Sequence, residues 1–179
     1  FKKNKVDYIR GLGAIQDSNH VEVTSSDGSK QMIEGSNILI ATGCKSRELP
    51  PLPFNGKSVI SSKEAMAPAT QPKEMIIIGA GAIGVEFAYI YNAFGTKVTI
   101  VEMLPNLLPV EDTEIGQELQ SSFTKQGVKC LTNTKCVNFH DNGDSVSIDI
   151  EGPNGSDTIN ADVCLVAIGF GKPISSSSM

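Results

Sequence analysis

The residues with the clearest chemical meaning form a glycine-rich motif near the middle of the chain. Gly79, Gly81 and Gly84 have the spacing G-x-G-x-x-G and directly follow the apolar run Met75–Ile78. Between a strand and a helix, the first glycine permits a tight turn, the second lets a ligand approach the backbone, and the third lets helix and strand pack closely. The helix N-terminus would then face an anion. The motif therefore predicts a binding site for the pyrophosphate of a dinucleotide.

An acidic residue stands where such a site needs one. Glu102 ends a second apolar run, Val98–Val101, near the offset from the glycines at which a carboxylate accepts hydrogen bonds from the adenosine ribose. The same carboxylate would repel the 2′-phosphate of NADP, and Met103 and Leu104 supply no compensating cation. We therefore predict NAD as the ligand. The alternative is a strand–turn–helix unit with an incidental acidic residue. That alternative must account together for the glycine spacing, the position between strand and helix, and Glu102.

Other residues that could do chemistry have simpler structural interpretations. Glu86 would lie in the first turn of the predicted helix, where the helix dipole stabilises a carboxylate whatever its function, so a cofactor role and a structural role stay equally open. His20 and His140 stand alone, so we expect neither a metal site nor a histidine base. The four cysteines lie far apart, which predicts free thiols in a reducing compartment. They are Cys44, Cys130, Cys136 and Cys164.

The elements around the glycine motif alternate between strand and helix. Apolar residues after the motif recur at helical spacing, and Gly95 is placed to end that helix. A second helix would begin at Asp112 or Thr113 and extend to Gly127, and a third strand would start near Val128. The apolar positions are Ile83, Phe87, Ile90 and Phe94 in the first helix and Ile115, Leu119 and Phe123 in the second.

Short strands are predicted on both sides of this region. Before it, a β-meander would feed one buried strand, Ile38–Ala41, and a linker with five prolines would follow from Glu48 to Pro72, with a capped helical turn at Ser61. After it, Asp141-Asn142-Gly143 signals a hairpin. The other predicted strands are Val6–Arg10, the alternating Val21 and Val23, Gln31–Glu34, Asn37–Ala41, Val137–Phe139, Val146–Ile150, Asp157–Asn160 and a buried Val163–Ile168, with a turn at Asp27-Gly28.

These patterns predict an α/β fold: a Rossmann-type parallel sheet with helices on both faces and an antiparallel β excursion. The composition, 40% hydrophobic and 20% charged, is ordinary for a soluble globular protein. The net charge of −5 comes without a basic stripe, so we expect no nucleic-acid partner. No apolar stretch approaches the roughly 18 residues of a membrane span. Since the chain opens on Phe1 and closes on Ser175–Met179, we expect a piece of a longer protein.

Several separated motifs give the chain a close resemblance to one family over nearly its whole length. It resembles the central portion of the dihydrolipoamide dehydrogenases, members of the pyridine nucleotide-disulfide oxidoreductase family. The motifs are Ile38–Gly43, Val59–Ser62, Ile78–Glu86, Leu108-Pro109 through Glu114–Gly116, and Val166–Gly169.

The resemblance implies a division of the chain. Residues 1–47 would be a partial flavin-domain β segment, 48–168 the NAD-binding domain, and 169–179 the start of a return to the flavin domain or a flexible tail. The residues implied to touch FAD are Gly13, Thr42, Gly43 and Cys44. Those implied to line the NAD site are Gly79, Ala80, Gly81, Ala82, Ile83, Gly84, Val85, Glu86, Glu102, Cys136 and Gly169, with Glu86 near the nicotinamide ribose.

The resemblance also implies a function for the parent protein. That enzyme would oxidise dihydrolipoyl groups through an active-site disulfide and pass electrons through FAD to NAD⁺. This sequence lacks the C-x-x-x-x-C redox pair, so we expect it to be inactive alone and assign it no catalytic residue. The implied parent is a homodimer that serves a lipoyl-bearing 2-oxoacid dehydrogenase complex. It would be located in the bacterial cytoplasm or the mitochondrial matrix and would not be secreted.

Two other functions remain open. The chain could be the nucleotide domain of a related disulfide reductase, although most of those use NADPH, which Glu102 disfavours. It could also be a free-standing NAD-binding or redox-sensing module, since no nucleophile or base stands out. The motifs implied to contact a flavin speak against this second alternative.

Overall fold

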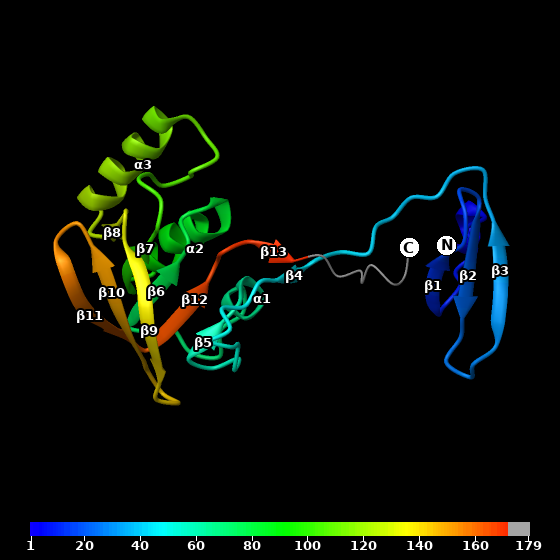
Figure 1. Ribbon diagram of the computed structural model, residues 1–179, viewed down its shortest axis with the longest axis horizontal. Helices are drawn as coiled ribbons and strands as arrows, with labels where there is room; N and C mark the ends of the chain where they lie inside the picture. Colours follow the sequence, from blue (N-terminus) through cyan, green and yellow to red (C-terminus); the bar gives the residue numbers. More distant parts are fainter. Residues whose placement is uncertain (172–179) are drawn as a thin grey trace. The chain divides into compact units, whose positions relative to one another are not determined.

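The computed structural model describes residues 1–171, which form two compact units (Figure 1). One unit contains Phe1–Lys45 and the other contains Ser46–Gly171. Most of the predicted return segment or tail, from residue 172 through the serine run Ser175–Ser178, lies outside the described residues.

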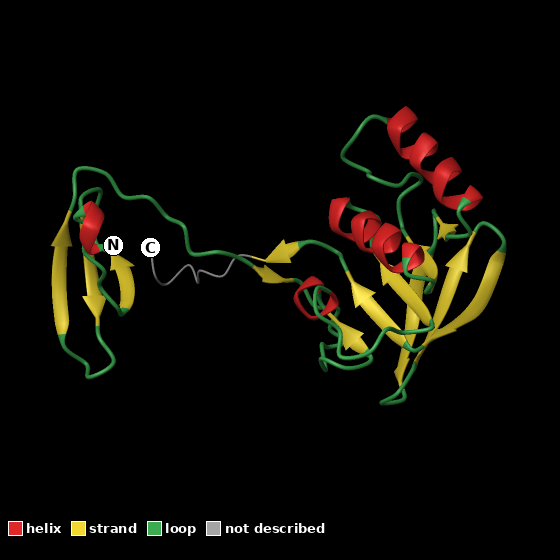
Figure 2. Cartoon of the chain, turned by 180° about the vertical axis from the view of Figure 1, so that it is seen from behind, coloured by secondary structure: helices red, strands yellow, loops and turns green. Residues whose placement is uncertain are grey.

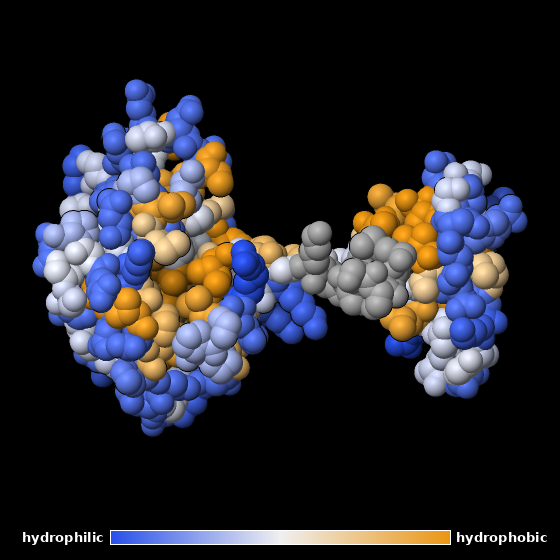
Figure 3. Space-filling view, viewed as in Figure 1, coloured by the Kyte–Doolittle hydropathy of each residue, from blue (hydrophilic) through white to orange (hydrophobic). Residues whose placement is uncertain are grey.

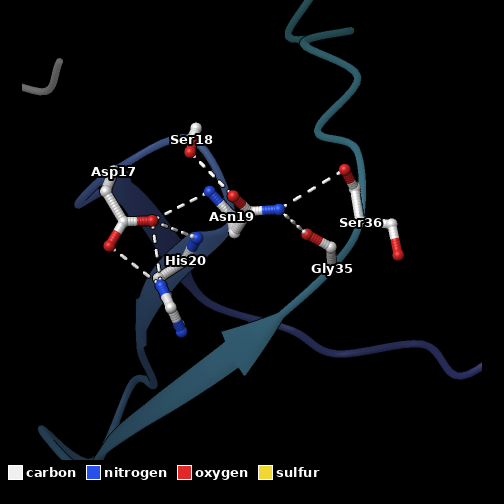
Figure 4. Close-up of polar contacts among 6 residues, drawn as sticks. All are labelled: Asp17, Ser18, Asn19, His20, Gly35 and Ser36. Atoms are coloured by element: carbon white, nitrogen blue, oxygen red, sulfur yellow. Dashed lines mark hydrogen bonds and ion pairs between the residues drawn. The ribbon is translucent and has the colours of Figure 1, made fainter.

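The first unit is a three-stranded antiparallel sheet in the order β1-β2-β3. Its elements are a 3₁₀ turn, η1 (Lys2–Asn4), and the strands β1 (Leu12–Ile15), β2 (His20–Thr24) and β3 (Lys30–Glu34). The strands predicted around Val21 and at Gln31–Glu34 are confirmed. In the turn before β2, the Asp17 carboxylate accepts hydrogen bonds from the backbone N–H groups of Asn19 and His20 (Figure 4). This side chain therefore sets the turn locally, as aspartate commonly does.

Two predicted strands of the first unit are wrong. Val6–Arg10 and Asn37–Ala41 are irregular, and neither pairs with a strand in the described part of the chain. Leu39 is 91% exposed and Ile40 is 51% exposed, so the expected buried strand Ile38–Ala41 lies in solvent. An apolar run becomes a buried strand only where neighbouring strands satisfy its backbone and other layers cover its side chains. Residues 1–171 supply neither to these segments.

The second unit is built on a five-stranded parallel sheet in the order β5-β12-β6-β7-β8. The strands are β5 (Val59–Ile60), β6 (Glu74–Ile78), β7 (Lys97–Val101), β8 (Lys129–Leu131) and β12 (Val163–Val166). The strands β6 and β12 are almost entirely apolar, as expected of parallel strands that are covered on both faces. The edge strand β5 comes from the stretch predicted to be a linker.

Helices cover one face of this sheet (Figure 2). They are α1 (Ser62–Ala65), α2 (Ala82–Ala93) and α3 (Thr113–Lys125). Their buried side chains, such as Ala88 and Phe123, form one apolar cluster with Ile77 and Ile100 of the sheet. This cluster is the core beneath the glycine-rich motif.

An antiparallel sheet in the order β11-β10-β9 covers the other face. Its strands are β9 (Lys135–Asp141), β10 (Val146–Gly152) and β11 (Gly155–Ala161). The alternating side chains Val146, Ile148 and Ile150 pack with Ile76 and Ile78 in a second apolar cluster. The α/β class and the antiparallel excursion are confirmed, but helices on both faces were predicted and the described residues have them on one. The antiparallel sheet takes the place of the predicted helices because the second face of the parallel sheet is apolar and must also be covered.

Local signals set the ends of the helices. Ser61 and Glu64 form a capping box, in which the Ser61 hydroxyl oxygen accepts from the Lys63 N–H at 3.2 Å and the Glu64 carboxylate accepts from the Ser61 N–H at 3.0 Å. Gly95 and Gly127 follow α2 and α3 with φ of +92° and +88°, which favours glycine. The predicted cap and both predicted helix ends are confirmed. A further short sheet pairs β4 (Lys45–Ser46) with β13 (Phe170–Gly171).

The buried face of α2 differs from the prediction. The apolar spacing predicted a face containing Ile83, Phe87, Ile90 and Phe94, whereas the helix buries Gly84, Val85, Ala88 and Tyr91. Ile90 is 43% exposed and Phe94 is 74% exposed. A Cβ on Gly84 would lie 2.0 Å from the Gly79 carbonyl oxygen, so this close contact fixes which side of the helix faces the turn. Because α2 is apolar on most sides, periodicity alone does not select that face.

Candidate dinucleotide-binding site

The predicted glycine motif forms a tight turn between β6 and α2. Gly79 has a φ of +100°, and its N–H donates to the Val101 carbonyl at 2.9 Å. A Cβ on Gly79 would lie 2.6 Å from the Ala167 carbonyl oxygen, and a Cβ on Gly84 would meet the Gly79 carbonyl. The protein's own packing therefore requires glycine at both positions, as predicted for a tight turn and a close helix–strand contact.

Gly81 is different, because nothing in residues 1–171 requires a glycine there. Its φ of −69° is ordinary, and apart from Gly81 itself and its chain neighbours no described atom lies within 4 Å of the position that a Cβ would take. Gly81 caps α2 without a side chain, so the first N–H groups of the helix receive no side-chain acceptor. These donors and the helix dipole favour an anion. The open space beside Gly81 therefore fits a phosphate group held close to the backbone.

Glu102 lies directly after β7, and its carboxylate reaches the glycine turn. Oε2 accepts a hydrogen bond from the Ala80 N–H at 2.7 Å, and Oε1 accepts one from the Leu104 N–H at 2.9 Å. The residue is only 8% exposed. A carboxylate has about four lone-pair sites, so Glu102 can still accept from ligand hydroxyls such as those of a ribose. The predicted acid and the predicted turn are thus brought together, and Glu102 also holds Ala80.

The carboxyl end of β12 completes this edge of the sheet. The Ala167 N–H donates to the Ile78 carbonyl at 2.8 Å, and the Ala167 carbonyl lies against Gly79. Gly169 follows with a φ of +100°, and its carbonyl accepts from the Arg47 N–H at 2.9 Å. The ends of β6, β7 and β12 therefore meet at the glycine turn, the place where open parallel sheets bind ligands.

The other motif residues belong to the start of α2. Ala82 and Glu86 are exposed, Ile83 is half-buried, and Val85 is part of the core. The prediction that Glu86 lies in the first helical turn is wrong, because α2 begins at Ala82 and its first turn contains no acidic residue. The influence of the helix dipole falls off beyond the first turn, so it does not explain Glu86. Glu86 borders a largely apolar hollow between α2 and α3 that also includes Tyr89.

The cysteines are free thiols, as predicted. Cys136 pairs with Ile150 between β9 and β10, and its side chain packs with the second apolar cluster. Burial raises the pKa of Cys136 and of Cys130 to about 11, and it also raises the pKa of the fully buried Cys164. These three thiols are therefore protonated and unreactive near neutral pH. A nucleotide contact of Cys136 stays a prediction.

The residues implied to touch a flavin lie in the first unit. Gly13 pairs with Val23 between β1 and β2, whereas Thr42, Gly43 and Cys44 are exposed in an irregular segment where Gly43 has a φ of +76°. A positive φ favours glycine whatever the ligand. The flavin contacts of these four residues stay predictions.

The histidines lie toward the surface and do not gather other ligands. Nδ1 of His20 lies 2.9 Å from the Asp17 carboxylate at an exposed turn (Figure 4). Residues 1–171 contain no group of three or more His, Cys, Asp and Glu side chains that could hold a metal ion. No helix in the same residues has the length and apolar character needed to cross a bilayer.

Two contacts of the turn have no counterpart in the predicted site. The Leu108 N–H donates to the Ala80 carbonyl at 2.8 Å, and Gly116 of α3 packs against the Leu107 carbonyl. Both Leu108 and Gly116 belong to motifs that carry the family resemblance. Their relation to the turn depends on tertiary contacts, so the motifs alone could not assign them a role.

Comparisons with known proteins agree with this architecture. A family model described as pyridine nucleotide-disulphide oxidoreductase matches residues 1–176. The chain is 41% identical over 172 residues to a dihydrolipoamide dehydrogenase of Chaetomium thermophilum, covering 94% of this chain and 34% of the relative. It is also 41% identical over 170 residues to a dihydrolipoyl dehydrogenase of Chlorobaculum tepidum, covering 94% of this chain and 36% of the relative.

Solved structures show the same fold. A crystal structure of LpdA from Mycobacterium tuberculosis matches with a TM-score of 0.79 and 28% identity, covering 94% of this chain and 37% of that one. The flavoprotein disulfide reductase RclA of Escherichia coli matches with a TM-score of 0.75 and 28% identity, covering 96% of this chain and 38% of that one.

Fold and sequence similarity place the chain among relatives that are flavoprotein disulfide reductases and dihydrolipoamide dehydrogenases. The chain belongs to the pyridine nucleotide-disulphide oxidoreductase family. Proteins of this type use FAD and NAD. The chain spans about a third of the length of the curated relatives it matches.

Proposed function

We propose that the unit Ser46–Gly171 binds NAD(H) at the glycine turn. The observation that carries this proposal is the open space at Gly81, where no packing contact within residues 1–171 gives a reason for a glycine. A dinucleotide pyrophosphate supplies that reason, because it must approach the backbone more closely than a Cβ would allow. The N-terminus of α2 then provides N–H donors and a favourable dipole for the phosphates.

Each end of the dinucleotide has candidate partners on this chain. Glu102 would accept hydrogen bonds from the adenosine ribose, and its buried carboxylate would oppose the 2′-phosphate of NADP. Glu86 would lie near the nicotinamide ribose, and Gly169 would border the turn from the end of β12. NAD supplies the hydride-accepting group, whereas the residues of this chain bind and orient it.

The whole protein, in this proposal, is a dihydrolipoamide dehydrogenase. It would oxidise dihydrolipoyl groups and pass electrons through FAD to NAD⁺, serving a 2-oxoacid dehydrogenase complex as a homodimer. The names of the relatives support this substrate. Residues 1–47 would belong to the flavin domain, and Gly13 and Thr42–Cys44 would approach FAD. The free thiols fit a reducing compartment, either a bacterial cytoplasm or a mitochondrial matrix.

Titration with NADH and with NADPH, followed by nicotinamide fluorescence, tests the nucleotide assignment. The informative variant is Glu102→Gln, which loses the negative charge and keeps one oxygen to accept from the Ala80 N–H, while its amide nitrogen can no longer accept from the Leu104 N–H. We expect NADH to bind wild type more tightly than NADPH. The variant should bind NADH about tenfold more weakly, the loss expected for a charged hydrogen-bond acceptor. The difference between its affinities for NADH and NADPH should therefore be smaller than in wild type.

The exposed Glu118 of α3 provides a control for the loss of one charge. Glu118→Gln should leave both affinities at the wild-type values. A wild-type chain that binds neither nucleotide, or that prefers NADPH, would contradict the proposal.

A further inference from the structure

The Ala80 peptide groups are held on both sides before any ligand arrives. The Ala80 N–H donates to the Glu102 carboxylate at 2.7 Å, and the Ala80 carbonyl accepts from the Leu108 N–H at 2.8 Å. Ala80 is fully buried, so water does not compete for these bonds. The glycine turn is therefore fixed by residues from two later segments of the chain.

The bond from Leu108 determines where the next N–H points. The Ala80 carbonyl and the Gly81 N–H belong to one peptide group, and in a trans peptide these two groups point in opposite directions. The structure contains no cis peptide among its described residues. Because the Ala80 carbonyl points toward Leu108, the Gly81 N–H points away from Leu108. No acceptor among residues 1–171 forms a hydrogen bond with that N–H. The donor is left available to a ligand.

The conformation of Leu108 is unusual. Its φ is +49°, in the left-handed region that a bulky side chain rarely adopts. Such a conformation persists only where the surroundings hold it, and it often marks a functional position. Here the Leu108 side chain packs against the first apolar cluster, and its carbonyl accepts from the Glu111 N–H at 2.9 Å.

Gly116 provides the room that this arrangement needs. It is buried in α3, and a Cβ on it would lie 2.3 Å from the Leu107 carbonyl oxygen. Leu107 is itself fully buried in the first apolar cluster, so it cannot move freely. Any side chain at position 116 would therefore displace the backbone that carries the Leu108 N–H.

We propose that Leu108 and Gly116 are positioning residues of the nucleotide site. The Leu108 N–H fixes the Ala80–Gly81 peptide so that the Gly81 N–H faces the pyrophosphate, and Gly116 allows Leu107 and Leu108 to approach the turn. This inference rests on the proposed binding of NAD(H). A turn that is already organised loses less freedom on binding, which increases affinity.

A pair of substitutions at one position separates the loss of the side chain from the loss of the N–H and of the positive φ that directs it. Leu108→Gly removes the side chain but keeps the N–H and permits a positive φ, whereas Leu108→Pro lacks the N–H and fixes φ near −65°. In the full chain, we expect Leu108→Pro to bind NADH about threefold to tenfold more weakly than Leu108→Gly, as for one lost hydrogen bond. Gly116→Ala should lose affinity over the same range relative to wild type.

Controls distinguish positioning from general destabilisation. Gln117→Ala changes the exposed neighbour of Gly116 and should bind NADH as wild type does. Ile148→Val weakens the second apolar cluster, so it should lower the melting temperature without changing the dissociation constant. All constants are measured where circular dichroism shows a folded chain. Hydrogen exchange of the Leu108 amide can be measured in the wild-type chain. The exchange rate should be low, and NADH should lower it further.

The possible failures are distinct. A wild-type chain that binds no NADH overturns the proposed function itself. If wild type binds NADH but Leu108→Pro equals Leu108→Gly and Gly116→Ala equals wild type, the positioning role is wrong. If Leu108→Pro does not fold, Gly116→Ala and the exchange of the Leu108 amide decide the matter, because a rapidly exchanging amide contradicts the bond to Ala80.

Discussion

The three glycines of the motif have different reasons to be glycine. Gly79 has a positive φ and lies against the Ala167 carbonyl, and Gly84 lies against the Gly79 carbonyl. Gly81 has an ordinary φ and faces open space. The first and third positions are therefore structural in this chain, whereas the second would be explained by the proposed ligand.

Substituting alanine at two of these positions should separate folding from binding. In Gly84→Ala the new Cβ would collide with a backbone oxygen, so we expect a loss of about 1 to 3 kcal/mol in the free energy of unfolding, as for an overpacked site. Gly81→Ala meets no described packing neighbour, so it should lose only glycine's advantage over alanine at an N-cap, less than Gly84→Ala loses, while NADH binding weakens at least severalfold. Calorimetry and NADH titration measure the two effects. Equal stability losses in both variants would contradict this division of roles.

Among the elements, the β9–β10 hairpin has a specific attachment to the edge of the parallel sheet. The Asp141 carboxylate accepts from the Ser58 hydroxyl at 2.7 Å and from the Asn55 side-chain amide at 2.7 Å. It also accepts from the Gly143 N–H at 2.9 Å within the hairpin turn. These residues join the turn predicted from Asp141-Asn142-Gly143 to the loop before β5. The sequence predicts the turn at Asp141, but it does not predict the long-range hydrogen bonds that the same side chain makes.

These contacts predict a dependence of stability on pH. The hydrogen bond from Ser58, followed by that from Gly143, keeps the pKa of Asp141 below its ordinary 3.8. The folded state therefore binds fewer protons than the unfolded state near that pH. The contribution of Asp141 is complete above the ordinary carboxylate pKa and is lost as the pH falls through the lower folded value. Asp141→Asn should cost up to about 1 kcal/mol at pH 7, and the cost should be smaller at pH 3, below the ordinary carboxyl pKa.

Asp144 offers a matched control for this measurement. It pairs with Lys57 but is highly exposed, so Asp144→Asn should change the unfolding free energy little. Urea unfolding at pH 7 and at pH 3 compares the variants. A cost of Asp141→Asn that persists undiminished in acid would show that the ionised carboxylate is not the stabilising group.

At the scale of the whole molecule, the two units differ in how much core they contain. Both apolar clusters consist of residues from the second unit. Among the described hydrophobic residues of the first unit only Val23 is buried, and apolar side chains are exposed on its surface (Figure 3). These exposed side chains include Phe1, Tyr8, Leu12, Met32 and Leu39. A three-stranded sheet with so little buried surface is marginal in water.

The second unit should therefore fold without the first. A fragment 46–171 should unfold cooperatively, with a melting temperature near that of the full chain, and should bind NADH with an affinity within about twofold of it. The fragment 1–45 should show no cooperative transition by circular dichroism. A fragment 46–171 that is unfolded, or that loses NADH binding while folded, would contradict the assignment of the site to this unit alone.

The sequence by itself determined the local parts of this protein. The glycine turn, the capping box at Ser61, the helix ends at Gly95 and Gly127 and the hairpin at Asp141–Gly143 depend on residues close together in the chain. Backbone geometry and capping act over a few residues, so residue types and spacing suffice to predict them. The acid at position 102 was predictable because its spacing from the glycines is set by one strand–helix–strand unit.

Only the tertiary structure decided which surfaces meet. It set the buried face of α2. Because α2 is apolar on most sides, its sequence pattern does not select a face, and the contact between Gly84 and Gly79 does. It placed an antiparallel sheet on the face expected to carry helices, and it left Ile38–Ala41 exposed where a buried strand was expected. It also brought Leu108 and Gly116 to the glycine turn. Apolar residues specify burial but not a partner, and the partner is chosen by packing between segments far apart in the sequence.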